Sequence, residues 1–203
     1  RPKSSAASDV YKRQDMAIDF IKESKELGKP FMLMCQHKAP HRTWMPALRH
    51  LHLYDDIDIP EPKTLFDQYE GRIPAQHQEM EIDRHMYLDH DLFTDLAPDL
   101  DFPKQRRPSE DRSAYINMKR MTPDQLKTWR AAYDPKDKAF REAKLTGRDL
   151  VRWKFQRYAK NYLRAIKGVD ENLARLRKAL EDQDLADNTV CLLYTSDAAD
   201  DLG

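Results

Sequence analysis

The sequence predicts an α/β fold, with a mostly parallel sheet flanked by helices and one long crossover helix. An apolar run, Phe31 to Cys35, is followed directly by a polar loop, as at the end of a buried strand. Apolar residues then recur with helical spacing between Asp149 and Asp182, and a second apolar run begins at Thr189-Val190. Strand, excursion, long helix and strand in this order are typical of a crossover connection in an α/β layer.

The composition indicates one domain, or a large part of one, with an extensive polar surface. The 203 residues are 40% hydrophobic and 34% charged, and the formal net charge is zero. This balance argues against nucleic acid as a partner, and no apolar run approaches the roughly 18 residues that cross a bilayer. Cys35 and Cys191 do not have the spacing of a metal site or of a disulfide framework.

The two ends of the chain differ in character from its centre. Residues 1–14 (RPKSSAASDVYKRQ) and 191–203 (CLLYTSDAADDLG) resemble translated adapter sequence, so we expect a non-native leader and a non-native tail there. The alternative is a disordered basic leader and an acidic tail. On the first interpretation, residues 15–190 are the central part of a longer protein.

Helix signals precede the first predicted strand. Apolar residues recur with helical spacing from Asp15 to Leu27, and Asp15 is suited to cap that helix. Gly28 and Pro30 then provide a stop signal. The strand Phe31–Cys35 has no polar alternation, which predicts burial on both faces.

The second half of the chain carries the clearest helix patterns, after an excursion over residues 63–121 that is expected to contain short helices, such as one at Gln76–Met86. The sequence from Thr122 to Gln125 (TPDQ) is a capping-box start with proline at the first helical position. It predicts a helix to about Tyr133. A second helix is predicted from Pro135 to about Leu145, because proline disrupts a helix interior.

The long helix, from about Asp149 to Asp182, is predicted from a single apolar stripe. The stripe consists of Tyr158, Tyr162, Ile166, Val169, Leu173, Leu176 and Leu180. A coiled coil would use the same spacing, but the strands on either side favour one helix packed against a sheet.

The loop after the first strand is the predicted ligand site. Within a few residues of the strand end, the loop contains Lys38, His41, Arg42 and Trp44. Ligands of open α/β sheets bind in the crevice beyond the carboxyl ends of the strands. Ammonium and guanidinium groups complement an oxyanion such as phosphate or sulfate, and a histidine can protonate a leaving oxygen.

Two other interpretations of this loop were weighed. His37 and His41 have the spacing of a helical zinc site, but Pro40 lies between them and makes a helix there unfavourable. The neighbouring cations also disfavour a bound metal. The remaining alternative is a solvated basic loop with ordinary histidines.

Three segments together resemble type I (formylglycine-dependent) sulfatases. They are KPFMLMCQHKAPHRTWMP, HLYDDIDIPEPKTLFDQYEGR and YAKNYLRAIKGVDENLARLRKALEDQDLADNTV, in the family's order. The resemblance covers most of residues 15–190, so these residues would be the central part of a sulfatase catalytic domain. It is similar in particular to N-acetylglucosamine-6-sulfatase-like and iduronate-sulfatase-like enzymes.

The resemblance implies a partial alkaline-phosphatase-like fold and a sulfuric ester hydrolase acting on sulfated sugars or glycosaminoglycan-like glycans. It implies His41 as general acid or sulfate contact, Lys38 as a cation near the sulfate, and Arg42 and Trp44 as substrate contacts. It also implies a formylglycine, a bound calcium, and a periplasmic or secreted parent protein.

The sequence departs from the family pattern in ways that affect activity. No C-x-P-S-R or C-x-A-G-R nucleophile motif and no early Asp-Asp metal pair occur, so calcium ligands cannot be assigned in this chain. We therefore expect the 203-residue chain itself to be inactive. The alternatives are a phosphonate or phosphate-ester hydrolase of the same superfamily, and a non-catalytic helical interaction module.

Overall fold

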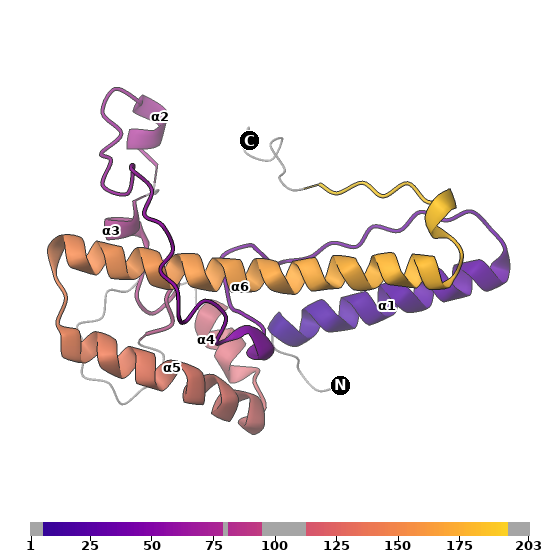
Figure 1. The fold of residues 1–203 in the computed structure, drawn as a ribbon, viewed down its shortest axis with the longest axis horizontal. Helices are drawn as coiled ribbons and strands as arrows, with labels where there is room; N and C mark the ends of the chain where they lie inside the picture. Colours follow the sequence, from indigo (N-terminus) through magenta and orange to yellow (C-terminus); the bar gives the residue numbers. More distant parts are fainter. Residues whose placement is uncertain (1–5, 79–80, 95–112, 195–203) are drawn as a thin grey trace.

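The computed structural model describes residues 6–78, 81–94 and 113–194, and the described part of the chain is helical. Its elements are α1 (Ala6–Leu27), η1 (Leu48–His50), α2 (Ile73–Gln76), α3 (Ile82–His85), α4 (Ser113–Lys119), α5 (Pro123–Ala143), α6 (Gly147–Asp182) and η2 (Ala186–Asn188). Figure 1 shows α6 as the long axis of the molecule. Helix α5 runs beside its N-terminal half and α1 beside its C-terminal half.

The long helix is confirmed, and its boundaries agree with the prediction within two residues at the start. The capping box at the start of α5 is also confirmed, since the Thr122 side chain accepts from the Gln125 N–H and the Gln125 side chain accepts from the Thr122 N–H. Helix α1 ends at Leu27 as predicted, but it begins at Ala6 and so includes part of the predicted leader.

The predicted division of α5 at Pro135 is wrong, because the helix is continuous from Pro123 to Ala143 with Pro135 inside it. The physical reason lies in the packing on both sides of the proline. Tyr133 and Asp137 are buried, and both are bonded to side chains of α6. These tertiary contacts offset the backbone hydrogen bond that a proline cannot donate.

The predicted parallel sheet is not present among the described residues, which include no strand. The segment Phe31–Cys35 returns along α6 (Figure 1), and Phe31 and Leu33 pack against the contact of α1 with α6. Met32 and Met34 on the other side are 82% and 70% exposed. The prediction of burial on both faces is therefore wrong for this chain, because nothing in its described part covers the second face.

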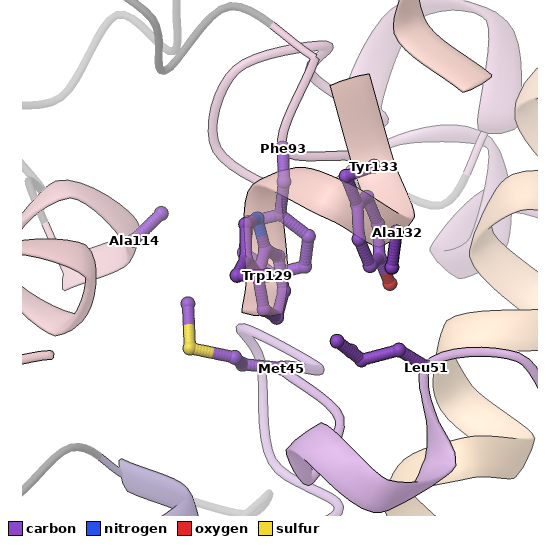
Figure 2. Packing of buried hydrophobic residues seen from close by; sticks show 7 residues of the cluster. All are labelled: Met45, Leu51, Phe93, Ala114, Trp129, Ala132 and Tyr133. Atoms are coloured by element: carbon purple, nitrogen blue, oxygen red, sulfur yellow. The ribbon is translucent and has the colours of Figure 1, made fainter. Parts of the chain in front are cut away.

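A cluster of large apolar side chains joins the candidate loop to α5 (Figure 2). Its buried members are Met45, Leu51, Phe93, Ala114, Trp129, Ala132 and Tyr133. The Trp129 and Tyr133 rings stack with centroids 4.3 Å apart, and Phe93 meets Trp129 edge-on at 5.4 Å. Aromatic pairs of this kind stabilise a core beyond their buried area. The residues at the end of the candidate loop, from Met45 to Leu51, are therefore held in place by a well-packed core.

The most buried face of α6 is polar, and the predicted apolar stripe is mostly half-buried. Lys154 donates to the Asp83 carbonyl at 2.7 Å, Arg157 to the Leu92 carbonyl at 3.0 Å. Arg164 donates to the Leu53 carbonyl at 2.8 Å. The long cationic side chains reach backbone oxygens that an apolar residue would leave unpaired. Helix α6 thus holds the segments around residues 51–55 and 81–94.

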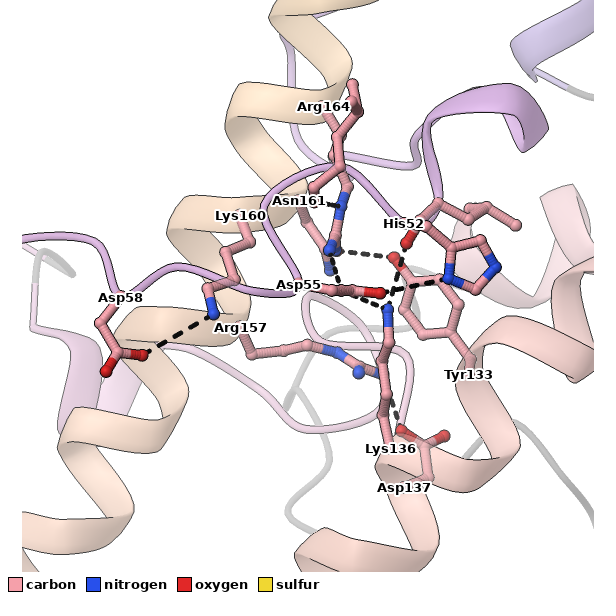
Figure 3. A network of polar contacts seen from close by, with 12 residues as sticks. His52, Asp55, Asp58, Tyr133, Lys136, Asp137, Arg157, Lys160, Asn161 and Arg164 are labelled. Carbon is pink, nitrogen blue, oxygen red and sulfur yellow. Dashed lines mark hydrogen bonds and ion pairs between the residues drawn. The ribbon is translucent and has the colours of Figure 1, made fainter.

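Figure 3 shows the polar network that connects residues 52–58 to α5 and α6. Asp55 accepts from Lys136 and from Arg164, each at 2.6 Å. The buried Asp137 accepts from Arg157 at 2.6 Å.

Within the part of the chain that the structure describes, no helix is long and apolar enough to cross a membrane.

Candidate active site

The predicted site residues lie in the loop between α1 and η1, and the buried Met45 and Pro46 anchor its exit. The His41 N–H donates to the Lys38 carbonyl at 2.8 Å, which forms a tight turn. The side chains of Lys38 and His41 are exposed. The turn therefore presents an ammonium group and an imidazole to solvent from a fixed backbone.

Arg42 is the best-anchored residue of the loop. Its Nε and Nη2 donate to the two carboxylate oxygens of Asp91 at 2.6 and 2.5 Å, and Nη2 also donates to the His85 carbonyl at 3.0 Å. The guanidinium lies 5.8 Å from the centre of the Tyr87 ring. Its expected contact with substrate stays a prediction, because these two nitrogens are engaged within the protein.

Trp44 packs on α6. Its ring meets Tyr158 edge-on with centroids 4.7 Å apart, and it lies 6.4 Å from the ring of Tyr162. Burial raises the pKa of the Tyr158 hydroxyl, which keeps this aromatic contact uncharged. Trp44 is therefore a half-buried wall of the loop, and its contact with a sugar stays a prediction.

The histidines of the loop differ in their surroundings. The Nδ1 atom of His41 is in hydrogen-bonding contact with the Arg42 carbonyl oxygen. Because a carbonyl can only accept, Nδ1 carries the hydrogen in this contact, and Nε2 is the nitrogen that it leaves for other partners. The Nε2 atom of His37, by contrast, is buried and has no hydrogen-bond partner among the described residues.

The sequence alone did not single out Asp91, which is fully buried below the loop. It follows Asp89 and His90 in a region that looked irregular, although such an Asp/His cluster beside apolar residues is a detectable signal. Lys154 of α6 is buried as well. Desolvation lowers the pKa of its ammonium group, and the charges of Asp83 and Asp91 oppose that shift.

The acidic, histidine and cysteine side chains of the described residues do not gather into a metal centre. The described residues contain no group of three or more His, Cys, Asp or Glu side chains placed to hold a metal ion. Burial raises the pKa of the half-buried Cys35 thiol, with an opposing effect of Arg13, so the reactive thiolate is disfavoured.

Comparison with known proteins identifies the family. The family model described as Sulfatase matches residues 11–203. The chain belongs to the sulfatase family. It is 38% identical over 189 residues to N-acetylglucosamine-6-O-sulfatase of Bacteroides thetaiotaomicron, a match that covers 93% of this chain and 33% of the relative. The sulfatase chain therefore spans about a third of the length of this relative.

A solved structure is similar to this sulfatase chain as well. It is the structure of a protein in complex with its substrate D-glucosamine-2-N,6-O-disulfate, with a TM-score of 0.74 and 38% sequence identity. The match covers 89% of this chain and 35% of that chain. The helical arrangement described above is thus part of a sulfatase architecture, of the alkaline-phosphatase-like type.

Proposed function

We propose that this chain is part of a sulfuric ester hydrolase that removes sulfate from sulfated glucosamine or related glycans. One observation carries the proposal: His41 is exposed on the anchored turn, with Nδ1 held by the Arg42 carbonyl. The similar proteins are a 6-O-sulfatase and a protein whose substrate is a 6-O-sulfated glucosamine, and both support this substrate class.

In this proposal His41 acts at the leaving group. Its Nε2 would donate a proton to the ester oxygen as the sulfur–oxygen bond breaks. The Lys38 ammonium would offset the negative charge of the sulfate, and Arg42 and Trp44 would shape the adjoining wall. A calcium ion bound by residues outside this set would supply further charge stabilisation, and a formylglycine elsewhere in the protein would supply the nucleophile.

The proposal extends to the sheet and to the location of the protein. The extended segment at residues 31–35 and the segment that begins at residues 189–190 would be strands of the sheet of the full-length protein, because their exposed side chains, such as Met32 and Val190, need a cover. The parent protein would be periplasmic or secreted, as the resemblance implies.

The test is a comparison of ester substrates with the full-length protein. We expect turnover of 6-O-sulfated glucosamine at a higher kcat/KM than turnover of the matching phosphate ester. A preference for the phosphate or phosphonate ester would instead support the alternative hydrolase. The 203-residue chain alone should show no turnover above its His41→Ala variant.

The packing inside the chain is evidence against a helical interaction module. Helix α6 is in contact with α1, α3 and η1, and its polar face is bonded to loops of the same chain. A module that binds through α6 would need that face to be available.

A further inference from the structure

We propose that Asp91 is a positioning residue for the reaction: it clamps the Arg42 guanidinium, and the Arg42 carbonyl in turn sets the orientation of the His41 imidazole. The inference rests on the proposed function for the role of His41. Asp91 lies 49 positions after Arg42 in the sequence and belongs to none of the motifs identified in the sequence analysis.

The clamp has the geometry of a strong ion pair. Both Asp91 oxygens accept from Arg42, at 2.6 and 2.5 Å, and the Asp91 side chain is 0% exposed while that of Arg42 is 25% exposed. Paired, nearly parallel hydrogen bonds between guanidinium and carboxylate restrict both distance and direction. The Tyr87 N–H also donates to Asp91 at 2.8 Å, which fixes the carboxylate itself.

The clamp acts on His41 through one backbone group. The Arg42 carbonyl oxygen is the partner of His41 Nδ1, so the position of Arg42 decides where that imidazole is held. A histidine whose Nδ1–H is fixed by a carbonyl keeps Nε2 as its reactive nitrogen, and such supporting contacts orient reactive histidines in many sites. Without Asp91, the guanidinium would lose both of its hydrogen bonds to the carboxylate, and Arg42 would be held less firmly in its partly buried position.

A second buried ion pair provides a matched control. Asp137 of α5 accepts from Arg157 of α6 at 2.6 Å, and both side chains are nearly buried. Neither residue lies in the candidate loop. Replacing Asp137 by asparagine perturbs a buried carboxylate–guanidinium pair to a similar degree, but leaves the Arg42–Asp91 contact in place.

The experiment compares Asp91→Asn and Asp137→Asn in the full-length protein, at a temperature at which circular dichroism shows both to be folded. Asp91→Asn should lower kcat about 10- to 100-fold with little change in KM, as expected for loss of a supporting contact. Asp137→Asn should leave kcat and KM at the wild-type values. On an Arg42→Gln background, Asp91→Asn should cause little further loss.

Histidine ring NMR of the 203-residue chain adds a readout that does not need activity. The Nδ1–H form of His41 should dominate its neutral state in the wild type and in Asp137→Asn, and its share should fall in Asp91→Asn. Wild-type kcat with Asp91→Asn, or equal losses in both variants, overturns the inference. If the full-length protein hydrolyses neither ester, the proposed function fails, and the tautomer result alone decides the inference.

Discussion

Arg164 of α6 should contribute far more to stability than another arginine of the same helix. Its side chain is 2% exposed and donates to the Leu53 carbonyl at 2.8 Å, to the Asn161 amide oxygen at 3.0 Å and to Asp55 at 2.6 Å. Arg164→Met keeps much of the apolar volume but removes all three donors.

The cost follows from which acceptors are left without a donor. The partly buried Leu53 carbonyl loses the donor that Arg164 supplied, and because an unsatisfied acceptor costs roughly 1–3 kcal/mol when fully buried, we expect a cost near the lower end of that range. Asp55 keeps Lys136 at 2.6 Å and is a third exposed, so it recovers part of its interaction. Breaking one side of a buried charge pair costs about 3–5 kcal/mol in other proteins. We expect about 3 kcal/mol here, because Asp55 keeps a partner.

The matched control is Arg177→Met. Arg177 is 82% exposed and pairs with Glu181, one turn further along α6, at 2.8 Å. Such exposed pairs contribute roughly 0.5 kcal/mol or less. Urea unfolding at neutral pH, followed by circular dichroism at 222 nm, measures both free energies of unfolding. A difference between the variants of less than about 1 kcal/mol would refute the assigned role of the polar face.

Two further predictions follow from α5. Burial raises the pKa of Asp137 to about 6 from an ordinary 3.8, against the opposing effect of Arg157. The folded state therefore binds the proton more tightly, and this stabilisation is lost as pH rises through about 6. Between pH 3.8 and about 6, the unfolding midpoint of the wild type should fall as the pH rises, and that of Asp137→Asn should change less. Thr122→Ala removes the cap of α5 and should cost about 1 kcal/mol in urea unfolding, and no measurable loss would contradict the capping role.

The helices were predictable where local signals agree with packing. The capping box at Thr122 correctly located the start of α5, and the periodic stretch ending at Asp182 correctly identified α6. Pro135 misled the prediction because local propensity cannot register the burial of Tyr133 and Asp137 on either side of it. Periodicity likewise identified α6 as a helix, but not its most buried face.

The composition of the loop after the apolar run directed attention to its cations and histidines, but not to the residues that support them. Lys38 and His41 are exposed, and their roles toward a ligand stay predictions. Asp91 acts through a contact that spans 49 positions of sequence, and no local pattern shows such a pairing. The strand Phe31–Cys35 was predicted from its apolar content, but pairing in a sheet needs neighbouring strands as well.

The most direct test of the central claim is the turnover of 6-O-sulfated glucosamine by the full-length protein carrying His41→Ala. Loss of general acid catalysis should lower kcat by about 100-fold or more. The matched control is His52→Ala, because His52 is 74% exposed and contacts Asp55 at the edge of the polar network, away from the candidate loop. The account predicts a large loss for His41→Ala and wild-type turnover for His52→Ala. Wild-type turnover by His41→Ala would contradict it.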